Sequence, residues 1–291
     1  MKLLLIDGNN LAFRVYWTHR RLVYNTMPVG LLFGFFKSLI SLKKSFSDYN
    51  FVIAWDGGYE RRLKESEEAV EKGMIASTYK ANRRDGDIDP EIAIMFEQMP
   101  TLKEALQFSR VLQITIDGFE ADDVIYSYSK NNKDGENLVI TSDKDYYQMI
   151  SDNTSIYDSM KSTLWTRKIF KDSYGIDPEL WVDVGALSGD KGDNIISVYG
   201  IGEKTALKLV QEFGDIDAIF EGLEKREKIK KKEQLILNSK PLVRLAKSLK
   251  KMDYIENIPS VKIAPRNEIA MTEWFGQYNF NMLIPEAWRL C

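Results

Sequence analysis

The sequence contains few of the residues that form disulfides or bind soft metals. Among its 291 residues there is one cysteine, Cys291, and one histidine, His19. A single cysteine excludes an intramolecular disulfide and fits a reducing compartment, for which we expect the cytoplasm. Because zinc sites are built mainly from cysteine and histidine, we do not expect a zinc site.

Long apolar runs are also missing. No run approaches the roughly 18 apolar residues that a membrane helix needs. Asp7 interrupts the apolar N-terminus too early for a signal peptide, so we expect no membrane association. Hydrophobic residues make up 44% and charged residues 29% of the chain, a balance typical of a globular protein. The net charge of −3 does not by itself indicate nucleic-acid binding.

Short apolar runs alternate with helical patterns in the first part of the chain. The runs at 2–6, 51–55, 113–116 and 138–141 are typical of buried parallel strands, and helices are expected at 31–46, 91–108 and 121–130. This alternation predicts an α/β core over residues 1–177, with a mostly parallel central sheet flanked by helices.

The pattern becomes helical and glycine-punctuated after residue 177. Helices are expected at 180–187, 203–212, 216–223 and 235–249, and the basic stretch 224–232 is interpreted as a solvated helix face. We therefore expect residues 178–291 to form a second, helical region.

Acidic residues follow three of the expected strands. Asp7, Asp56 and Asp143 each come directly after an apolar run or one residue later. One such acid is usually a turn or a helix cap, but the carboxyl ends of parallel strands meet at one edge of a sheet. We therefore expect these three carboxylates to converge.

Six further acids extend this cluster. Glu120, Asp122 and Asp123 open an expected helix, Asp145 follows Asp143, and Asp190 and Asp193 lie in a glycine-bearing loop. Each has an ordinary alternative as a cap or turn residue. Together, nine carboxylates would repel one another unless hard cations such as Mg²⁺ or Mn²⁺ intervene. Two such ions about 3.5–4 Å apart are the usual arrangement for phosphodiester hydrolysis. When these nine acids are set aside, the chain has 34 acidic and 40 basic residues, so the rest of the protein is mildly basic.

Two further motifs suit contacts with phosphates. Tyr79, Lys80, Arg83 and Arg84 place an aromatic ring beside three cations. This is either an exposed helix turn or a phosphate clamp in which Lys80 and Arg83 share a helical face and Tyr79 stacks on a base.

The second motif is a glycine turn that opens a helix. It comprises Gly200, Ile201, Gly202, Glu203, Lys204 and Thr205, and Glu203 excludes a Walker A loop. It suits a helix–hairpin–helix contact with a DNA backbone, spanning residues 180–213.

The ordered set of motifs resembles the structure-specific 5′ nucleases, or flap endonucleases. The nearest likeness is to the phage enzymes and to the 5′-nuclease domain of bacterial DNA polymerase I. The motifs are Ile6–Asn10 with Phe13 and Arg14, Trp55–Gly57, Tyr79–Arg83, Gln98–Pro100 with Lys103 and Glu104, Gly118–Asp123, Thr141–Asp145, Gly189–Asn194 and Gly200–Ala206. The resemblance implies a PIN-like 5′-nuclease fold and a stand-alone, monomeric replication nuclease of the phage type.

The resemblance also implies residue roles. One metal ion would be held or oriented by Asp7, Asp56, Glu120, Asp122 and Asp123, and the second by Asp143, Asp145, Asp190 and Asp193. Lys80 and Arg83 would contact the scissile phosphate and Arg14 would support it. Residues 79–110 would form an arch for the 5′ strand. The hairpin at Gly200–Gly202 would hold duplex DNA and possess a K⁺ site. A further family arginine falls in the long segment 57–78, where Arg61 and Arg62 are alternatives.

The expected activity is 5′-3′ exonuclease and flap endonuclease cleavage. Substrates would be DNA with 5′ flaps, nicks or single-strand/duplex junctions, and RNA–DNA primers, giving 5′-phosphate products. A catalytically weak DNA-structure-binding protein of the same fold is the first alternative. An RNase is the second, although the hairpin motif favours a duplex backbone.

Overall fold

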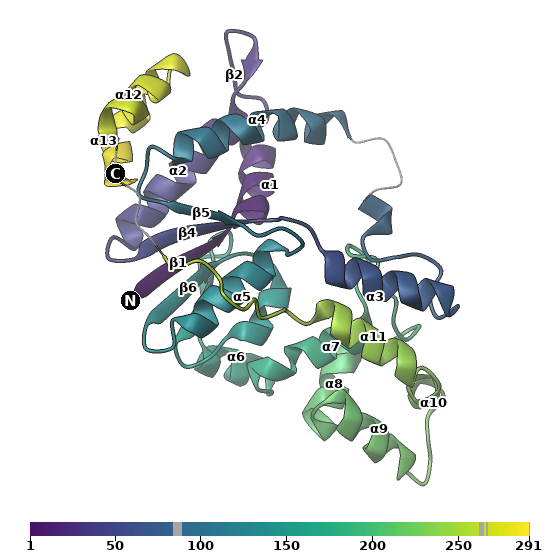
Figure 1. The fold of residues 1–291 in the computed structure, drawn as a ribbon. Helices are drawn as coiled ribbons and strands as arrows, with labels where there is room; N and C mark the ends of the chain where they lie inside the picture. Colours follow the sequence, from purple (N-terminus) through teal and green to yellow (C-terminus); the bar gives the residue numbers. More distant parts are fainter. Residues whose placement is uncertain (84–88, 262–264, 266, 291) are drawn as a thin grey trace.

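A six-stranded, mostly parallel sheet forms the centre of the molecule (Figure 1). The computed structural model describes residues 1–83, 89–261, 265 and 267–290. The strand order is β5-β4-β1-β6-β7-β8, in which only β8 pairs antiparallel. The strands are β1 (Lys2–Asp7), β4 (Asn50–Trp55), β5 (Leu112–Thr115), β6 (Glu136–Ile140), β7 (Thr154–Asp158) and β8 (Thr163–Trp165). The four expected strands are present, and β7 and β8 extend the sheet beyond them.

The sheet is covered on both faces because its central strands β4, β1 and β6 are apolar on both sides. Leu4 and Ile6 face a core formed with α1 (Gly8–His19), α2 (Gly30–Ser45) and α4 (Pro90–Leu106). Leu3 and Leu5 face the opposite core, formed with α5 (Ala121–Asn131) and the 3₁₀ helix η2 (Lys144–Met149). This three-layer arrangement confirms the predicted α/β class. A small hairpin, β2 (Val23–Tyr24) and β3 (Met27–Pro28), connects α1 and α2.

The helical region extends the core that contains Leu3 and Leu5. It comprises α6 (Arg167–Tyr174), η3 (Pro178–Leu180), α7 (Trp181–Ser188), α8 (Glu203–Phe213), α9 (Ile216–Glu224), α10 (Lys231–Asn238) and α11 (Lys240–Lys250). The single helix expected at 235–249 is wrong: it is divided at Ser239, because Pro241 starts a new helix in its first turn. The basic stretch 224–232 is not one helix face either, since α9 ends at Glu224 and α10 begins at Lys231.

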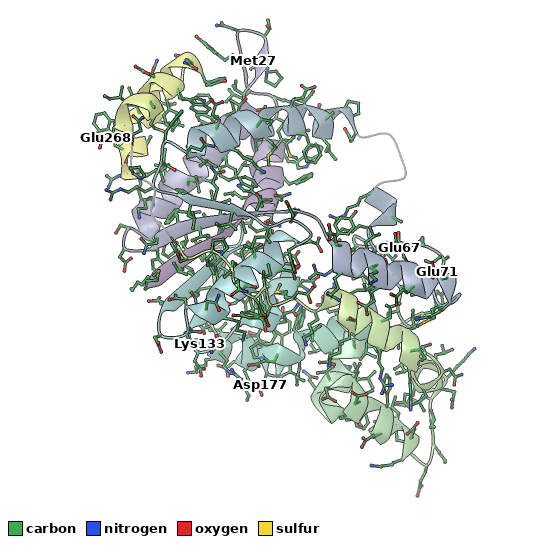
Figure 2. The ribbon with its side chains drawn as sticks, viewed as in Figure 1. Met27, Glu67, Glu71, Lys133, Asp177 and Glu268 are labelled. Carbon is green, nitrogen blue, oxygen red and sulfur yellow. The ribbon has the colours of Figure 1, made fainter. Side chains whose placement is uncertain are left out.

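Helix α3 (Glu60–Glu71) lies beside α11 (Figure 1). Its inner face presents Arg62, Ser66 and Ala69 at helical spacing, and all three are buried. Glu67 and Glu71, from the acidic run, lie on the exposed side of the helix (Figure 2). Helix α3 therefore has an acidic face toward solvent and an inner face that places Arg62 in the interior of the molecule. The 3₁₀ helix η1 (Ala81–Arg83) follows farther along the chain.

The last described residues depart from the expected division of the chain. They form α12 (Glu268–Gln277), η4 (Asn281–Leu283), α13 (Ile284–Ala287) and η5 (Trp288–Leu290). These elements pack on α2 rather than on the helical region (Figure 1). The ring of Trp274 lies 5.2 Å from that of Phe36, centre to centre. Aromatic burial against α2 therefore assigns residues 268–290 to the α/β core. None of the described helices is long and apolar enough to cross a bilayer.

Candidate active site

The three strand-end aspartates converge, as the sequence predicts. Asp7 caps α1 by accepting a hydrogen bond from the Asn10 N–H at 2.8 Å, and the Tyr146 hydroxyl donates to its other oxygen at 2.9 Å. Burial, the Asp56 charge and the Asp143 charge together raise the pKa of Asp7 to about 7. This mutual effect shows that the three carboxylates lie close together.

Asp56 is held in place from both sides. The Asn9 side-chain amide donates to one of its oxygens at 2.8 Å, and the Ala121 N–H donates to the other at 2.9 Å. The Ala121 N–H belongs to the first turn of α5, where the helix dipole favours an anion. Burial still raises the pKa of Asp56, as it does for Asp143. Hence the edge of the sheet holds carboxylates that favour a compensating cation.

The acids at the start of α5 surround Arg62. Its guanidinium is nearly inaccessible and donates to Glu120 at 2.7 Å and to both oxygens of Asp123 at 2.7 and 2.8 Å. Although burial disfavours the charge of Arg62, the adjacent carboxylates raise its pKa. Of the two alternatives in segment 57–78, Arg62 is the one that reaches the acids, whereas Arg61 pairs with Asp253 and Glu65.

Asp123 departs from the expected role as a metal ligand. Its two oxygens accept four hydrogen bonds: two from Arg62, one from the Asp253 N–H at 2.7 Å and one from the Glu120 N–H at 3.3 Å. A carboxylate offers about four lone-pair sites, so these bonds use its capacity. Asp123 therefore orients Arg62 and Glu120 instead of facing an ion. Asp122, which is 3.6 Å from Arg62, keeps partial exposure, and burial raises its pKa.

Lys80 reaches the acids from an unusual backbone conformation. Its φ is +52°, and its N–H donates to the Asp193 carbonyl at 2.9 Å. The ammonium pairs with Glu120 and lies 3.8 Å from an Asp193 oxygen. Arg83 pairs with Asp193 and is more exposed than Lys80. The two cations thus meet the acids as expected, but through a left-handed turn followed by η1 rather than through a shared α-helical face.

Tyr79 does not have the expected exposed position. Its ring is buried beside Tyr59, and its hydroxyl donates to Glu120 at 3.0 Å and to Asp193 at 3.2 Å. A ring enclosed in this way cannot stack on a base, so that part of the prediction is wrong. Tyr79 instead connects acids of the two regions. Arg84 lies outside the described residues.

A second group of carboxylates comes together beside the first. One oxygen from each of Asp145, Asp190 and Asp193 lies within 4.8 Å of the others, which fits a metal site. Asp190 accepts from the Gly192 and Asp193 N–H groups at 2.8 and 3.3 Å. Lys250 lies between Asp145 and Asp190 at 2.7 and 2.8 Å. Sequence reasoning did not identify Lys250, because it lies in a lysine-rich helix far from any motif.

The pKa values reflect this environment. Burial raises the pKa of Asp145 to about 6, against the opposing effect of Lys250. At Asp190 burial also raises the pKa, but Lys250 and the two N–H donors outweigh it and leave the pKa below its ordinary value. The carboxylates in turn raise the pKa of Lys250. Asp190 is therefore the more readily ionised acid of this pair.

Arg14 lies near Asp7 and Asp158 with unused hydrogen-bonding capacity. Its Nη1 is buried and has no hydrogen-bond partner among the described residues. Burial lowers the pKa of Arg14, whereas the charges of Asp158 and Asp7 raise it. An unpaired buried donor is costly unless it receives an acceptor, so this atom is available to an anion.

The hairpin before α8 has the expected glycine geometry. Gly200 has a φ of +78°, and Gly202 caps α8, while Lys204 and Thr205 occupy the first turn of that helix. Ile201 is an exception among the expected contact residues, because its side chain is buried and its N–H donates to the Val198 carbonyl at 3.1 Å. Only its main chain can face a ligand. Tyr199, which the sequence reasoning overlooked, is 91% exposed at the tip.

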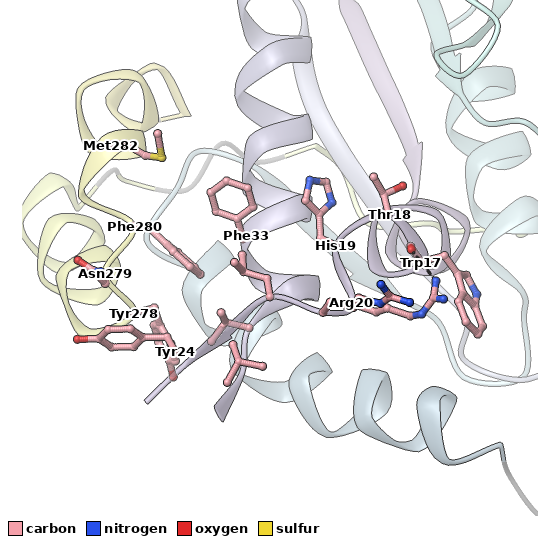
Figure 3. A pocket seen from close by; sticks show the side chains of 14 residues that line it. Trp17, Thr18, His19, Arg20, Tyr24, Phe33, Tyr278, Asn279, Phe280 and Met282 are labelled. Atoms are coloured by element: carbon pink, nitrogen blue, oxygen red, sulfur yellow. Dashed lines mark hydrogen bonds between the residues drawn. The ribbon is translucent and has the colours of Figure 1, made fainter. Parts of the chain in front are cut away.

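One hollow of the described surface lies away from the acids. It has a volume of about 740 Å³ and lies between the end of α1, the β2–β3 hairpin and the C-terminal elements (Figure 3). Trp17, His19, Phe33, Tyr278 and Phe280 are among the side chains around it (Figure 3). The described residues that line it include no acid. A smaller hollow of about 300 Å³ is lined by Asp143, Asp145, Asp190 and Lys250, among other residues.

An α/β sheet that gathers carboxylates and cations at its strand ends defines the class of metal-dependent phosphodiesterases. The chain belongs to the 5′-3′ exonuclease family: residues 2–175 match its N-terminal resolvase-like domain and residues 176–265 its C-terminal SAM fold. The predicted resemblance to the 5′ nucleases is thereby confirmed.

Similar proteins are found in bacteria and phage. A 5′-3′ exonuclease of Halalkalibacterium halodurans is 34% identical over 76% of this chain and 73% of its own length. The thermostable DNA polymerase I of Thermus thermophilus is 34% identical over 77% of this chain, which spans about a quarter of the polymerase (25%). A zinc-bound structure of the phage T5 5′-exonuclease has a TM-score of 0.70 and 25% identity, covering 86% of this chain and 89% of that one.

Proposed function

We propose that this chain is a divalent-metal-dependent 5′-3′ exonuclease and flap endonuclease. It would hydrolyse DNA phosphodiesters near single-strand/duplex junctions and leave 5′-phosphate products. The observation that carries the proposal is the meeting of two carboxylate groups at Lys80, which pairs with Glu120 and lies 3.8 Å from Asp193. A similar phage T5 flap endonuclease, 25% identical, has been solved in a complex with DNA and metal ions.

The donor set fits two hard divalent ions. Asp7, Asp56 and Asp122 would hold one, with Glu120 beside them, and Asp143, Asp145, Asp190 and Asp193 would hold the other. Oxygen-only ligands favour Mg²⁺, for which Mn²⁺ can substitute. Bound ions would supply an activated water and stabilise the leaving 3′ oxygen. The raised pKa of Asp7 supports this assignment, because crowded carboxylates gain most from a cation.

The cations would act on the phosphate. Lys80 is held at the junction of the two acid groups, and Arg83 is more exposed beside it. Both would donate to the phosphate oxygens on which charge develops in the transition state. The unpaired Nη1 of Arg14 would donate a further hydrogen bond to a phosphate oxygen. Arg62 and Asp123 would position these groups without touching the substrate.

The helical region would hold the duplex. The turn at Gly200–Gly202 and the first turn of α8, with Lys204 and Thr205, offer main-chain donors and a cation for a DNA backbone. Residues 79–110 would form the arch over the 5′ strand. The Lys232 ammonium lies 3.0 Å from the Gly200 carbonyl, so any K⁺ at this hairpin would share that oxygen with it. Primer and flap removal by a cytoplasmic monomer remains the predicted role.

Cleavage of a labelled 5′-flap duplex tests the proposal. We expect Asp190→Asn with Asp193→Asn to lower the Mg²⁺-dependent cleavage rate at least about 100-fold while DNA binding persists. Glu67→Gln with Glu71→Gln, on the exposed side of α3, is the matched control. Full cleavage by the Asp190/Asp193 variant would contradict the proposal. Binding without any cleavage by the unaltered chain, in Mg²⁺ and in EDTA alike, would favour the alternative of a DNA-structure-binding protein.

A further inference from the structure

Lys250 occupies the centre of the second acid group. It is the last residue of α11, and its side chain is buried. Its Nζ lies 2.7 Å from an Asp145 oxygen and 2.8 Å from an Asp190 oxygen. Asp145, Asp190 and Asp193 are the same three acids whose oxygens lie within 4.8 Å of one another. The ammonium therefore occupies the position where these acids would share a cation.

The surroundings of Lys250 are shaped to keep it there. Its main-chain carbonyl accepts from the Gln148 side-chain amide at 3.0 Å, and the Gln148 oxygen accepts from the Met252 N–H at 3.2 Å. The aliphatic part of Lys250 runs along α7 at Gly185. A Cβ at that position would approach its Cδ and Cε to 2.7 Å. The glycine thus leaves the space through which the lysine reaches the acids.

A lysine and a divalent ion cannot both use these oxygens fully. Two carboxylates at salt-bridge distance compensate one buried ammonium, and an incoming ion would compete for the same oxygens. The other acid group, around Asp7 and Asp56, has no comparable contact with Lys250 in the described ion pairs. Arg62 and Lys80 pair with Glu120 and Asp123 at the first group, but no ion pair among the described residues reaches Asp7 or Asp56. The two groups therefore differ in which of their acids already have a cation within the chain.

We propose that Lys250 is an internal cation that competes with the second divalent ion. The inference rests on the proposed function only in assigning Asp145, Asp190 and Asp193 to a metal site. The ion near Asp7 binds first, and the ion at the second group binds only as the Lys250 ammonium leaves Asp145 and Asp190. The two sites therefore fill at different ion concentrations.

Mn²⁺ binding to the full chain, followed by electron paramagnetic resonance, tests this directly. We expect one tight and one weaker ion in the unaltered protein. In Lys250→Met the second dissociation constant falls at least about tenfold. Lys251→Met, which removes a neighbouring exposed lysine, is the matched control and should leave both constants unchanged. An unchanged or weaker second ion in Lys250→Met overturns the proposal.

A second variant keeps the test decisive if loss of the lysine impairs folding. Gly185→Ala retains the lysine but places a methyl group against its Cδ and Cε, so the ammonium is displaced from the acids. The second Mn²⁺ should again bind more tightly, and circular dichroism checks that the fold persists. If the second ion binds Gly185→Ala no more tightly than the unaltered chain, the proposal fails. The measurement needs no cleavage, so its outcome is separate from that of the flap assay.

Discussion

Arg62 is the residue on which the arrangement of acids at the start of α5 depends. It satisfies Glu120 and both oxygens of Asp123 in a nearly inaccessible position. Buried ion pairs add little net stability compared with apolar packing, but removing one partner leaves the others uncompensated. Arg62 therefore holds carboxylates that would otherwise repel one another beneath the active site.

Replacing this arginine should destabilise the metal-free protein. We expect Arg62→Ala to lower the free energy of unfolding by about 3–5 kcal/mol, because Glu120 and Asp123 remain buried without their partner. Arg61→Ala, at the adjacent and more exposed position, should cost about 1 kcal/mol or less. Urea unfolding in EDTA measures both values. Equal losses of unfolding free energy in the two variants would contradict the special role of the buried ion pairs.

At the scale of elements, the hairpin before α8 combines a buried anchor with an exposed tip. Ile201 packs in the core while Tyr199, two residues earlier, projects into solvent. The left-handed Gly200 lies between them and allows this reversal. The turn is therefore fixed in position by one side chain and presents another outward.

The exposed tyrosine should contribute to duplex binding. We expect Tyr199→Ala to weaken binding of a metal-free 5′-flap duplex at least about tenfold, since a hydroxyl bond to a phosphate contributes about 1.5–3 kcal/mol. Tyr254→Ala, another exposed tyrosine on a different segment, should bind as the unaltered chain does. Fluorescence anisotropy at fixed salt measures both. Equal affinity of the two variants would remove Tyr199 from the binding surface.

The elements that sequence could predict are those with strong local patterns. Strands β1, β4 and β6 are apolar on both faces, and the acids after them meet because parallel strands end at one edge. Strands β7 and β8 have mixed patterns at the edge of the sheet. Arg62 and Lys250 were not placed among the acids, since a charged residue within a charged helix looks solvated until its packing partners are known. The buried position of Tyr79 likewise depends on tertiary contacts.

At the scale of the whole molecule, the acid cluster should make stability depend on pH. The pKa of Asp7 is raised to about 7 and that of Asp145 to about 6, from 3.8. Between the ordinary pKa and these raised values, the two carboxyl groups are ionised in the unfolded chain but still protonated in the folded chain. Folding stability from these groups is therefore greatest at low pH and falls as pH rises from about 4 to about 7. The depressed pKa of Asp190 acts in the opposite direction, but only below about pH 4.

Thermal unfolding with and without Mg²⁺ tests this dependence. We expect the metal-free protein to unfold at a lower temperature at pH 8 than at pH 5.5. Mg²⁺ should raise the unfolding temperature more at pH 8, because ionised carboxylates bind it better. Asp7→Asn should flatten the metal-free dependence. A metal-free unfolding temperature that rises through this window, with the same Mg²⁺ effect at both pH values, would contradict the assignment.

The acids come from distant parts of the chain, with Asp7 near one end and Asp190 and Asp193 beyond the sheet. A ribosome adding about 5–20 residues per second would need about 10–40 s to proceed from the first of these acids to the last. Throughout that interval the emerging polypeptide has an incomplete set of ligands and no Lys250. A complete set of these acids, and with it the proposed nuclease activity, therefore arises only late in synthesis.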